Sequence, residues 1–215
     1  MGAGIRYPAA GRVFGAVLAT AVAACHPAAA EPATEAMAIG QGTAGCRAAD
    51  GAVEALTCNG PVGWQVVIGY PAVGATLAFR RQDRPVPVTG ERWFPLDDVG
   101  DRRQPALWLM QGRAGRRTAR SLILPVVVLH PNDRRHLVAQ GAPPSRPRRS
   151  RAFLVILVSD REICLAAVVD RSAGRNALAD ARRAAGAIET CPARPRLVGR
   201  VSPTLSRVMA ERRSD

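Results

Sequence analysis

Lysine is missing from this sequence. All 30 basic residues among its 215 are arginine, against 17 Asp+Glu, and the formal net charge is +13 at pH 7. Such an excess of positive charge favours anionic partners, namely lipid head groups, acidic polysaccharides or nucleic acid. Alanine, glycine and proline are abundant too, so codon usage in a GC-rich genome also explains the all-arginine composition. The charge therefore indicates a class of partner without identifying one.

The sequence also lacks the motifs by which common enzymes and metal proteins are detected. It has no Gly-x-Ser-x-Gly segment, the nucleophile elbow of many hydrolases. His130 and His136 are six residues apart, whereas a helical metal-binding pair is four apart. The sequence contains no Cys-x-x-Cys pair, the spacing common in zinc sites. We therefore assign no catalytic, cofactor-binding or metal-binding residue.

Carboxylates occur in small groups that could serve as acid and base or hold a cation. Asp97, Asp98 and Asp101 lie close together but do not follow the twelve-residue calcium pattern, so we interpret them as a solvated turn. Asp160, Glu162 and Asp170 flank a predicted hairpin. Nothing in the sequence shows that their environments differ, as acid–base chemistry requires.

Aromatic residues are scarce, at 4% of the chain. A small sheet with little Phe needs its tryptophans to fill volume, so we predict that Trp64 lies in the core. Trp93 and Trp108 fit either the core or an exposed platform for sugars or lipids.

No apolar run is long enough to span a bilayer as a permanent helix; the run at residues 13–24 is too short. Two arginines precede this run, and small residues ending at Ala30 follow it. This order of charged, apolar and small residues is typical of a secretory signal. We predict that residues 1–30 are an export signal and that the mature protein is periplasmic or secreted.

The signal has two possible cleavage sites. One lies after Ala30. The other lies before Cys25, because Val22-Ala23-Ala24-Cys25 is similar to a bacterial lipobox, in which the cysteine becomes acylated. In the second case the protein is anchored to the membrane as a lipoprotein, and this lipid is its only predicted membrane contact.

Four cysteines follow the signal, namely Cys46, Cys58, Cys164 and Cys191. An even number in an oxidising compartment predicts disulfides, and four cysteines allow three connectivities. Cys46 and Cys58 suit a local loop. Cys164 lies in an apolar run and Cys191 ends a helical pattern, so we favour the pairs Cys46–Cys58 and Cys164–Cys191.

The pattern of apolar residues predicts an α+β fold: a mostly antiparallel sheet of short strands with one C-terminal helix packed on it, stapled by disulfides. The expected strands are residues 53–58, 63–70, 76–80, 92–96, 106–111, 121–129, 152–159 and 163–170. Residues 121–129 are apolar enough to be buried on both faces, although Pro125 there demands a bulge or an unpaired position. The helix is expected at 177–190, with its buried stripe at Leu178, Ala181, Ala185 and Ile188.

We divide the chain after the signal into a flexible leader (31–45), one globular domain (46–192) and a basic tail (193–215). The domain contains an Arg- and Pro-rich insertion at 131–150, expected to be irregular. A loop of this kind is either functional or a disordered spacer. Its candidate anion-binding residues are Arg134, Arg135, Arg146, Arg148 and Arg149.

Two segments of the sequence resemble segments of a known group of proteins. Residues 152–191, with a strand cysteine followed by an Asn-Ala segment that opens a helix ending in cysteine, resemble the end of small exported proteobacterial proteins of unknown function. Residues 46–79, which include Cys58-Asn59-Gly60-Pro61-Val62-Gly63-Trp64, are similar to their N-terminal hairpin. The resemblance implies disulfides and a periplasmic setting, and implies no activity.

These observations lead to one functional hypothesis and one alternative. The first is a non-catalytic envelope protein that binds an anionic lipid, lipopolysaccharide or another envelope protein; export argues against nucleic acid. The alternative is a periplasmic hydrolase of envelope polymers. A binding protein predicts arginines that converge on one exposed face, whereas an enzyme predicts a concave pocket with perturbed carboxylates.

Overall fold

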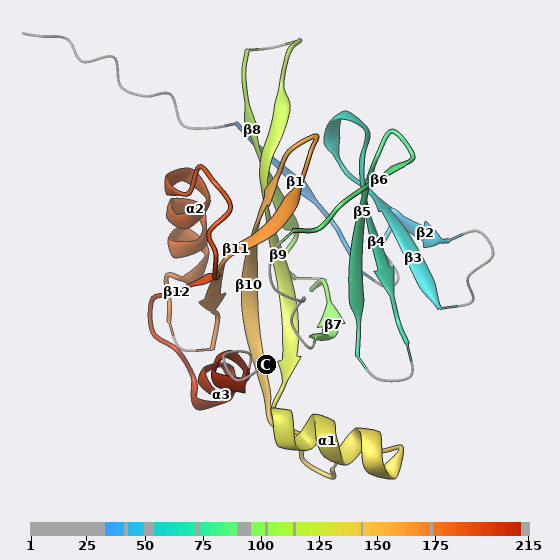
Figure 1. The fold of residues 1–215 in the computed structure, drawn as a ribbon, viewed down its shortest axis with the longest axis vertical. Coiled ribbons are helices and arrows are strands. Elements are labelled where there is room, and N and C mark those ends of the chain that lie inside the picture. The colour runs from blue at the N-terminus through green and yellow to red at the C-terminus, as the bar shows by residue number, and fades with distance from the viewer. Residues whose placement is uncertain are drawn as a thin grey trace, which may run out of the picture. The chain divides into compact units, whose positions relative to one another are not determined.

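The computed structural model describes residues 33–40, 43–49, 54–71, 74–89, 96–101, 103–113, 115–142, 144–172 and 174–211. The chain divides into two units, Met1–Glu31 and Pro32–Asp215, and every described element belongs to the second. The predicted export signal, Cys25 and Trp93 lie outside the described residues. The described part is α+β and mostly antiparallel, as predicted, but its strands divide into two sheets (Figure 1).

The larger sheet has seven strands in the order β1-β8-β9-β10-β11-β12, with β7 also paired to β9. All its pairs are antiparallel except β11–β12. The strands are β1 (Ala33–Met37), β7 (Leu96–Val99), β8 (Ala106–Gln111), β9 (Thr118–Leu129), β10 (Arg149–Val158), β11 (Ile163–Asp170) and β12 (Arg196–Val198).

The smaller sheet is an antiparallel meander of five strands in chain order. Its strands are β2 (Cys46–Ala48), β3 (Ala55–Asn59), β4 (Trp64–Gly69), β5 (Thr76–Arg81) and β6 (Arg84–Val86), with a 3-10 turn, η1 (Pro61–Gly63), between β3 and β4. Burial alternates along β4, where Trp64, Val66 and Ile68 are buried, because successive strand residues point to opposite faces.

The core lies on both faces of the seven-stranded sheet. One cluster joins that sheet to the meander and contains Trp64 and Trp108, whose ring centroids are 6.3 Å apart. Both tryptophans are therefore core residues, as predicted for Trp64. The second cluster packs the opposite face, including Phe153 and Val155, against helix α2 (Ala177–Ala187).

Pro125 sits in the central strand β9 without breaking it. On one side, β9 pairs continuously with β10 from Ser121 to Leu129. On the other, β8 pairs as far as Ile123 and β7 begins at Val126, so Pro125 falls between two partners. Its carbonyl accepts a hydrogen bond from Gly100 N–H on that side at 2.8 Å. A strand residue directs its N and C=O to the same side, so the missing N–H faces the interval between partners, as the unpaired-position prediction required.

Helix α2 begins at Ala177 as predicted and ends at Ala187, three residues earlier than expected. Ala181 and Ala185 are fully buried on the sheet, whereas Leu178 is only half-buried. Asn176 precedes the helix but its side chain makes no capping hydrogen bond. Small residues on the buried face let the helix approach the sheet closely.

Three regions expected to lack regular structure contain elements. In the expected leader, β1 pairs with β8. The 131–150 insertion contains helix α1 (Pro131–Gln140), which begins with Pro and is followed by Gly141 in a left-handed conformation (φ 69°), the usual asymmetry of helix ends. The basic tail contains β12 and helix α3 (Pro203–Glu211).

Helix α3 is held by burial. Its Leu205, Val208 and Met209 join the core cluster between the sheets, which gives this short segment an apolar partner surface. No helix in the described part of the chain combines the length and apolarity needed to cross a bilayer.

Candidate binding groove

One row of side chains crosses four neighbouring strands. Asp98 of β7 pairs with Val127 of β9, and Val127 pairs with Arg151 of β10. Arg171, just after β11, donates its backbone N–H to the Arg151 carbonyl at 2.8 Å. Residues paired directly across strands point to the same face, so these four side chains share one face of the sheet. Phe153, two residues beyond Arg151, packs against α2, which places the row on the α2 side.

The row lines a hollow in the surface. One part has a volume of about 790 Å³ and a second part a volume of about 480 Å³, and both share Asp98, Val127, Arg151 and Arg171. We call the two parts together the arginine groove. Its other polar lining residues are Thr43, Tyr70, Asp97, Asp101, Arg103, Arg149 and Ser172.

Two ion pairs form walls of the groove. Arg149 Nε lies 2.7 Å from Asp97 Oδ2, and Arg171 Nη1 lies 2.9 Å from Asp101 Oδ2. The Arg171 guanidinium also stands 4.8 Å above the Phe153 ring, a cation–π contact. The β7–β9 ladder shifts register between Leu96 and Asp98, and a bulge of this kind redirects the inserted side chain, here Asp97.

Asp101 is ionised more readily than an ordinary aspartate. Partial burial opposes its ionisation, but hydrogen bonds from the Arg103 backbone N–H and from Arg171 outweigh that effect and lower the pKa of Asp101. The Arg171 charge is therefore largely engaged by its own partner.

Arg151 and Asp98 form no ion pair among the described residues. Asp98 Oδ1 accepts a hydrogen bond from Val99 N–H at 2.8 Å. Although Asp98 as a whole residue is exposed, partial burial of its carboxylate raises its pKa, the Val99 hydrogen bond opposes this rise, and the neighbouring Asp97 charge adds to it. The groove thus offers two guanidinium groups without an ion pair in the described residues, Arg103 and Arg151, and one carboxylate without an ion pair, Asp98.

Tyr70, just after β4, contributes a hydroxyl to the same site. Burial, and then the nearby Asp98 charge, raise the pKa of Tyr70 to about 12, so the phenol is protonated at neutral pH. The hydroxyl oxygen is buried and lies close to the Asp98 carboxylate; hydrogen bonding between the two also raises the pKa of Tyr70, although no hydrogen bond of ordinary geometry forms within the described residues. Tyr70 and Asp98 therefore form one polar pair at this end of the groove, and a ligand hydroxyl could complete the hydrogen bonding of both groups.

A buried network supports the groove from behind. The Asp170 carboxylate, 2% exposed, accepts hydrogen bonds from the backbone N–H groups of Ser172 and Ser202, each at 2.7 Å. Ser150 Oγ lies 3.3 Å from both Asp170 oxygens, and Ser172 Oγ accepts from Arg151 N–H at 3.2 Å. The network connects β10, β11 and the start of α3, so we assign Asp170 a structural role.

The five candidate arginines of the insertion lie in different environments. Arg149 lines the groove. Arg148 binds the buried Asp133 through its backbone N–H, Nε and Nη2, at 2.6, 3.2 and 2.7 Å. Arg135 pairs with Glu211 of α3 at 2.7 Å. Arg134 and Arg146 are exposed and make no ion pair within the described residues. Only Arg149 of the five belongs to the groove lining.

Sequence reasoning missed most of the groove. The sequence does not single out Arg151, Arg171 or Tyr70, and the solvated turn predicted at Asp97 and Asp98 is strand β7 in the structure. One signal was present: Arg149 and Arg151 are two residues apart at the start of an apolar run, a spacing that places both on one face of a strand.

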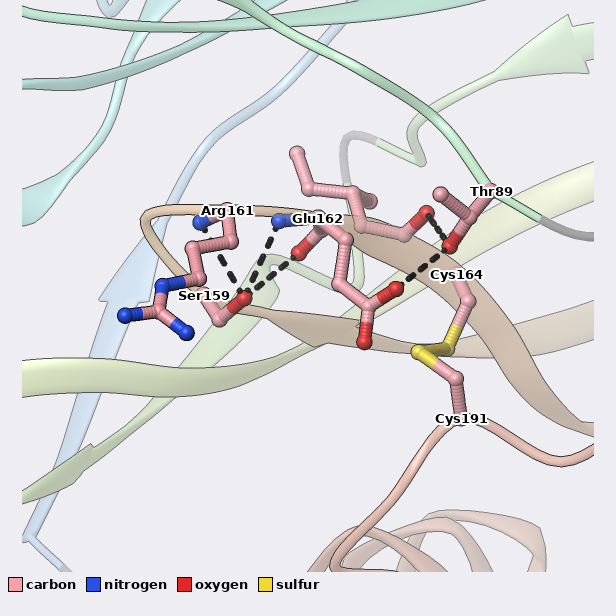
Figure 2. Close-up of a disulfide and its surroundings, with 7 residues drawn as sticks. Thr89, Ser159, Arg161, Glu162, Cys164 and Cys191 are labelled. Carbon is pink, nitrogen blue, oxygen red and sulfur yellow. Dashed lines mark hydrogen bonds between the residues drawn. A yellow bond between two sulfur atoms is a disulfide. The ribbon is translucent and has the colours of Figure 1, made fainter.

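The cysteine pairing is confirmed. Cys46–Cys58 joins directly opposed residues of β2 and β3, and Cys164–Cys191 ties the segment after α2 to β11. Figure 2 shows the second disulfide beside the β10–β11 turn, where Ser159 Oγ accepts from the Arg161 and Glu162 backbone N–H groups. Two disulfides fit a protein that folds outside the cytoplasm.

The part of the chain that the structure describes contains no group of three or more His, Cys, Asp or Glu residues arranged to hold a metal ion. The chain matches no protein-family model, no curated protein and no solved structure.

Proposed function

We propose that the protein is an exported, non-catalytic envelope protein that binds an anionic envelope component in the arginine groove. The observation that carries the proposal is the position of Arg151: an unpaired guanidinium in a concave site, flanked by the paired Arg149 and Arg171. A guanidinium can bind carboxylate or phosphate oxygens through two parallel hydrogen bonds. The net positive charge of the chain would speed the approach of such a ligand.

The proposed site of action is the periplasm or the cell exterior. The charged, apolar and small-residue order at 1–30 supports export, and so do the two disulfides, which persist in oxidising compartments. The resemblance to small exported proteobacterial proteins rests on this cysteine arrangement and on the hairpin residues. If processing occurs before Cys25, a lipid would hold the groove near a membrane.

The test is binding to lipopolysaccharide and to phosphatidylglycerol vesicles, with phosphatidylcholine vesicles as the uncharged reference. Arg151→Gln should weaken binding at least about ten-fold, because it removes a charge-assisted hydrogen bond. Arg182→Gln, on the exposed face of α2, is the matched control and should have little effect. Binding should also fall steeply with salt, since screening shortens to about 8 Å near physiological ionic strength. Equal affinities for the three proteins would contradict the proposal.

The insertion hypothesis is tested separately. Arg148 is unsuitable for this purpose, because its removal leaves the buried Asp133 without its partner. Arg134 and Arg146 are exposed and free of ion pairs within the described residues, so the double variant Arg134→Ser, Arg146→Ser should leave folding unchanged. A loss of vesicle binding in this variant would show that the insertion contributes to the anion-binding surface.

One observation favours the hydrolase alternative. Asp98 is a carboxylate with a raised pKa in a concave site, the property expected of a general acid. Under this alternative, the protein releases soluble fragments from purified envelope polysaccharide, and Asp98→Asn abolishes the release while binding persists. Absence of release by the unmodified protein leaves binding as the function.

A further inference from the structure

We infer that the arginine groove recognises an acidic sugar, meaning a hydroxyl-bearing ring that carries a carboxylate or a phosphate. The inference rests on the proposed function, because it names the chemistry of the ligand at the same site. It begins from the order of charges along the row Asp98, Val127, Arg151, which are register partners on three neighbouring strands.

The row is not uniformly basic. Asp98 and Arg151 stand on either side of the half-buried Val127, and Arg171, which is paired with Asp101, lies beyond Arg151. Neighbouring strands are about 4.8 Å apart, so the backbones of Asp98 and Arg151 are separated by about 10 Å. A sugar ring with its substituents fits between two such groups, and the volume of about 790 Å³ is within the range of small-molecule sites.

A simple polyanion fits this arrangement poorly. Its charges would be attracted to Arg151 and Arg103 but repelled by the carboxylates of Asp97 and Asp98, which line the same groove. An ionised carboxylate accepts hydrogen bonds and donates none. A ligand that satisfies both ends must therefore present an anionic group to Arg151 and hydrogen-bond donors to Asp98. Hydroxyl groups on an acidic sugar meet both requirements.

Two further features support a hydroxyl-rich ligand. The buried Tyr70 hydroxyl lines the Asp98 end and interacts with the Asp98 carboxylate, so its oxygen can accept a hydrogen bond from a ligand hydroxyl. The side chain of Val127 supplies an apolar floor for the C–H face of a ring. The ion pairs of Arg149 and Arg171 hold the walls in place before the ligand binds, which lowers the entropic cost of binding.

The experiment compares four probes by isothermal titration of the exported, oxidised protein. A galacturonic-acid oligosaccharide supplies the carboxylate, a monosaccharide phosphate supplies the phosphate, a neutral oligosaccharide of matched length supplies hydroxyls alone, and tripolyphosphate supplies charge alone. At least one acidic sugar should bind about ten-fold more tightly than both the neutral sugar and tripolyphosphate. The acidic sugar that binds identifies the source of the anionic group.

Variants separate the two ends of the row. Asp98→Asn should weaken binding of the acidic sugar about ten-fold, because it replaces a charge-assisted hydrogen bond, and should leave or improve binding of tripolyphosphate. Arg151→Gln should weaken both. Asp83→Asn, in the exposed turn between β5 and β6, is the control. If Asp98→Asn does not fold, Tyr70→Phe takes its place and should selectively weaken the acidic sugar.

The outcomes are distinguishable. Tripolyphosphate binding as tight as that of any acidic sugar, or an equal effect of Asp98→Asn on both, overturns the inference and leaves the proposed anion binding intact. If the unmodified protein binds no anionic probe, lipopolysaccharide or anionic vesicle, the proposed function and the inference fail together.

Discussion

At the residue scale, Asp133 and Arg148 show how the arginine-rich insertion is kept in place. Asp133 is 6% exposed in the first turn of α1, and three N–H groups of Arg148 converge on its carboxylate. The side-chain hydrogen bonds from Arg148 are the main cause that lowers the pKa of Asp133 to about 2. An arginine just before β10 thus anchors the start of α1, and its charge is not free to bind a ligand.

Asp133→Asn should destabilise the protein by about 1–3 kcal/mol at neutral pH, because it weakens the charge-assisted bonds to Arg148 in a buried position. The folded-state pKa lies below the unfolded value, so this stabilisation is present above about pH 4 and is lost as the pH falls toward 2. Thermal unfolding followed by circular dichroism from pH 7 to pH 2 should show the difference between the two proteins shrinking over that window.

Arg146→Ser is the control for this prediction. Arg146 is exposed and belongs to the same segment, but makes no ion pair within the described residues. The Arg146→Ser variant should therefore unfold at the same temperature as the unmodified protein. A difference between Asp133→Asn and the unmodified protein that stays constant from pH 7 to pH 2 would contradict the assignment.

At the element scale, α2 depends on small side chains. Ala181 and Ala185 are 0% exposed against β10 and β11, and no space for a larger side chain is expected in a close-packed contact. Leu178, which the sequence placed on the buried stripe, is only half-buried, so the stripe is centred on the alanines. Packing of this kind is sensitive to added volume.

Ala181→Leu should therefore destabilise the protein by about 1–3 kcal/mol through overpacking. Ala179→Leu makes the same chemical change on the exposed face and should stay within about 0.5 kcal/mol, since both residues are good helix formers. Chemical denaturation of the oxidised proteins measures both values. Similar losses in the two variants would mean that α2 does not pack on the sheet through this face.

Some elements were predictable from the sequence because their own residues carry the pattern. The strand around Val127 is apolar on both faces, and β4 alternates, so both were expected. Helix α1 was not predicted because the 131–150 segment around it is rich in arginine and proline, although Pro131 and Gly141 are good signals for a helix start and end. The short strands β1 and β12 have no distinctive pattern and form because a neighbouring strand offers them a partner.

At the scale of the whole molecule, the sequence predicted strands and disulfides but neither the division into two sheets nor the groove. Strand β1 pairs with β8 through Ala33 and Met110, a contact between distant segments that no local pattern reveals. The groove depends on register as well, since Asp98 and Arg151 share a row only because both align with Val127. Tyr70 reaches the same site from the meander. A site built from separate segments in this way requires the folded arrangement.

Export and disulfide formation can be tested on the same sample of the protein. Cys46–Cys58 staples the meander and Cys164–Cys191 staples the seven-stranded sheet to the segment after α2, so each bridge closes a loop and limits the unfolded chain. The full chain, expressed in a bacterium with a periplasm, should appear there without its first 30 residues, or in the membrane fraction without its first 24 and with a lipid on Cys25.

Intact mass measures the processing site, any acylation and the loss of four hydrogens to two disulfides in one experiment. Tryptic peptides mapped without reduction should link Cys46 to Cys58 and Cys164 to Cys191. Cys25→Ser distinguishes the two cleavage sites. If cleavage occurs after Ala30, the substitution changes nothing. If the protein is processed as a lipoprotein, the substitution abolishes acylation and removes the protein from the membrane fraction. Free thiols together with an intact N-terminus would contradict export, and with it the envelope partner that the groove is proposed to bind.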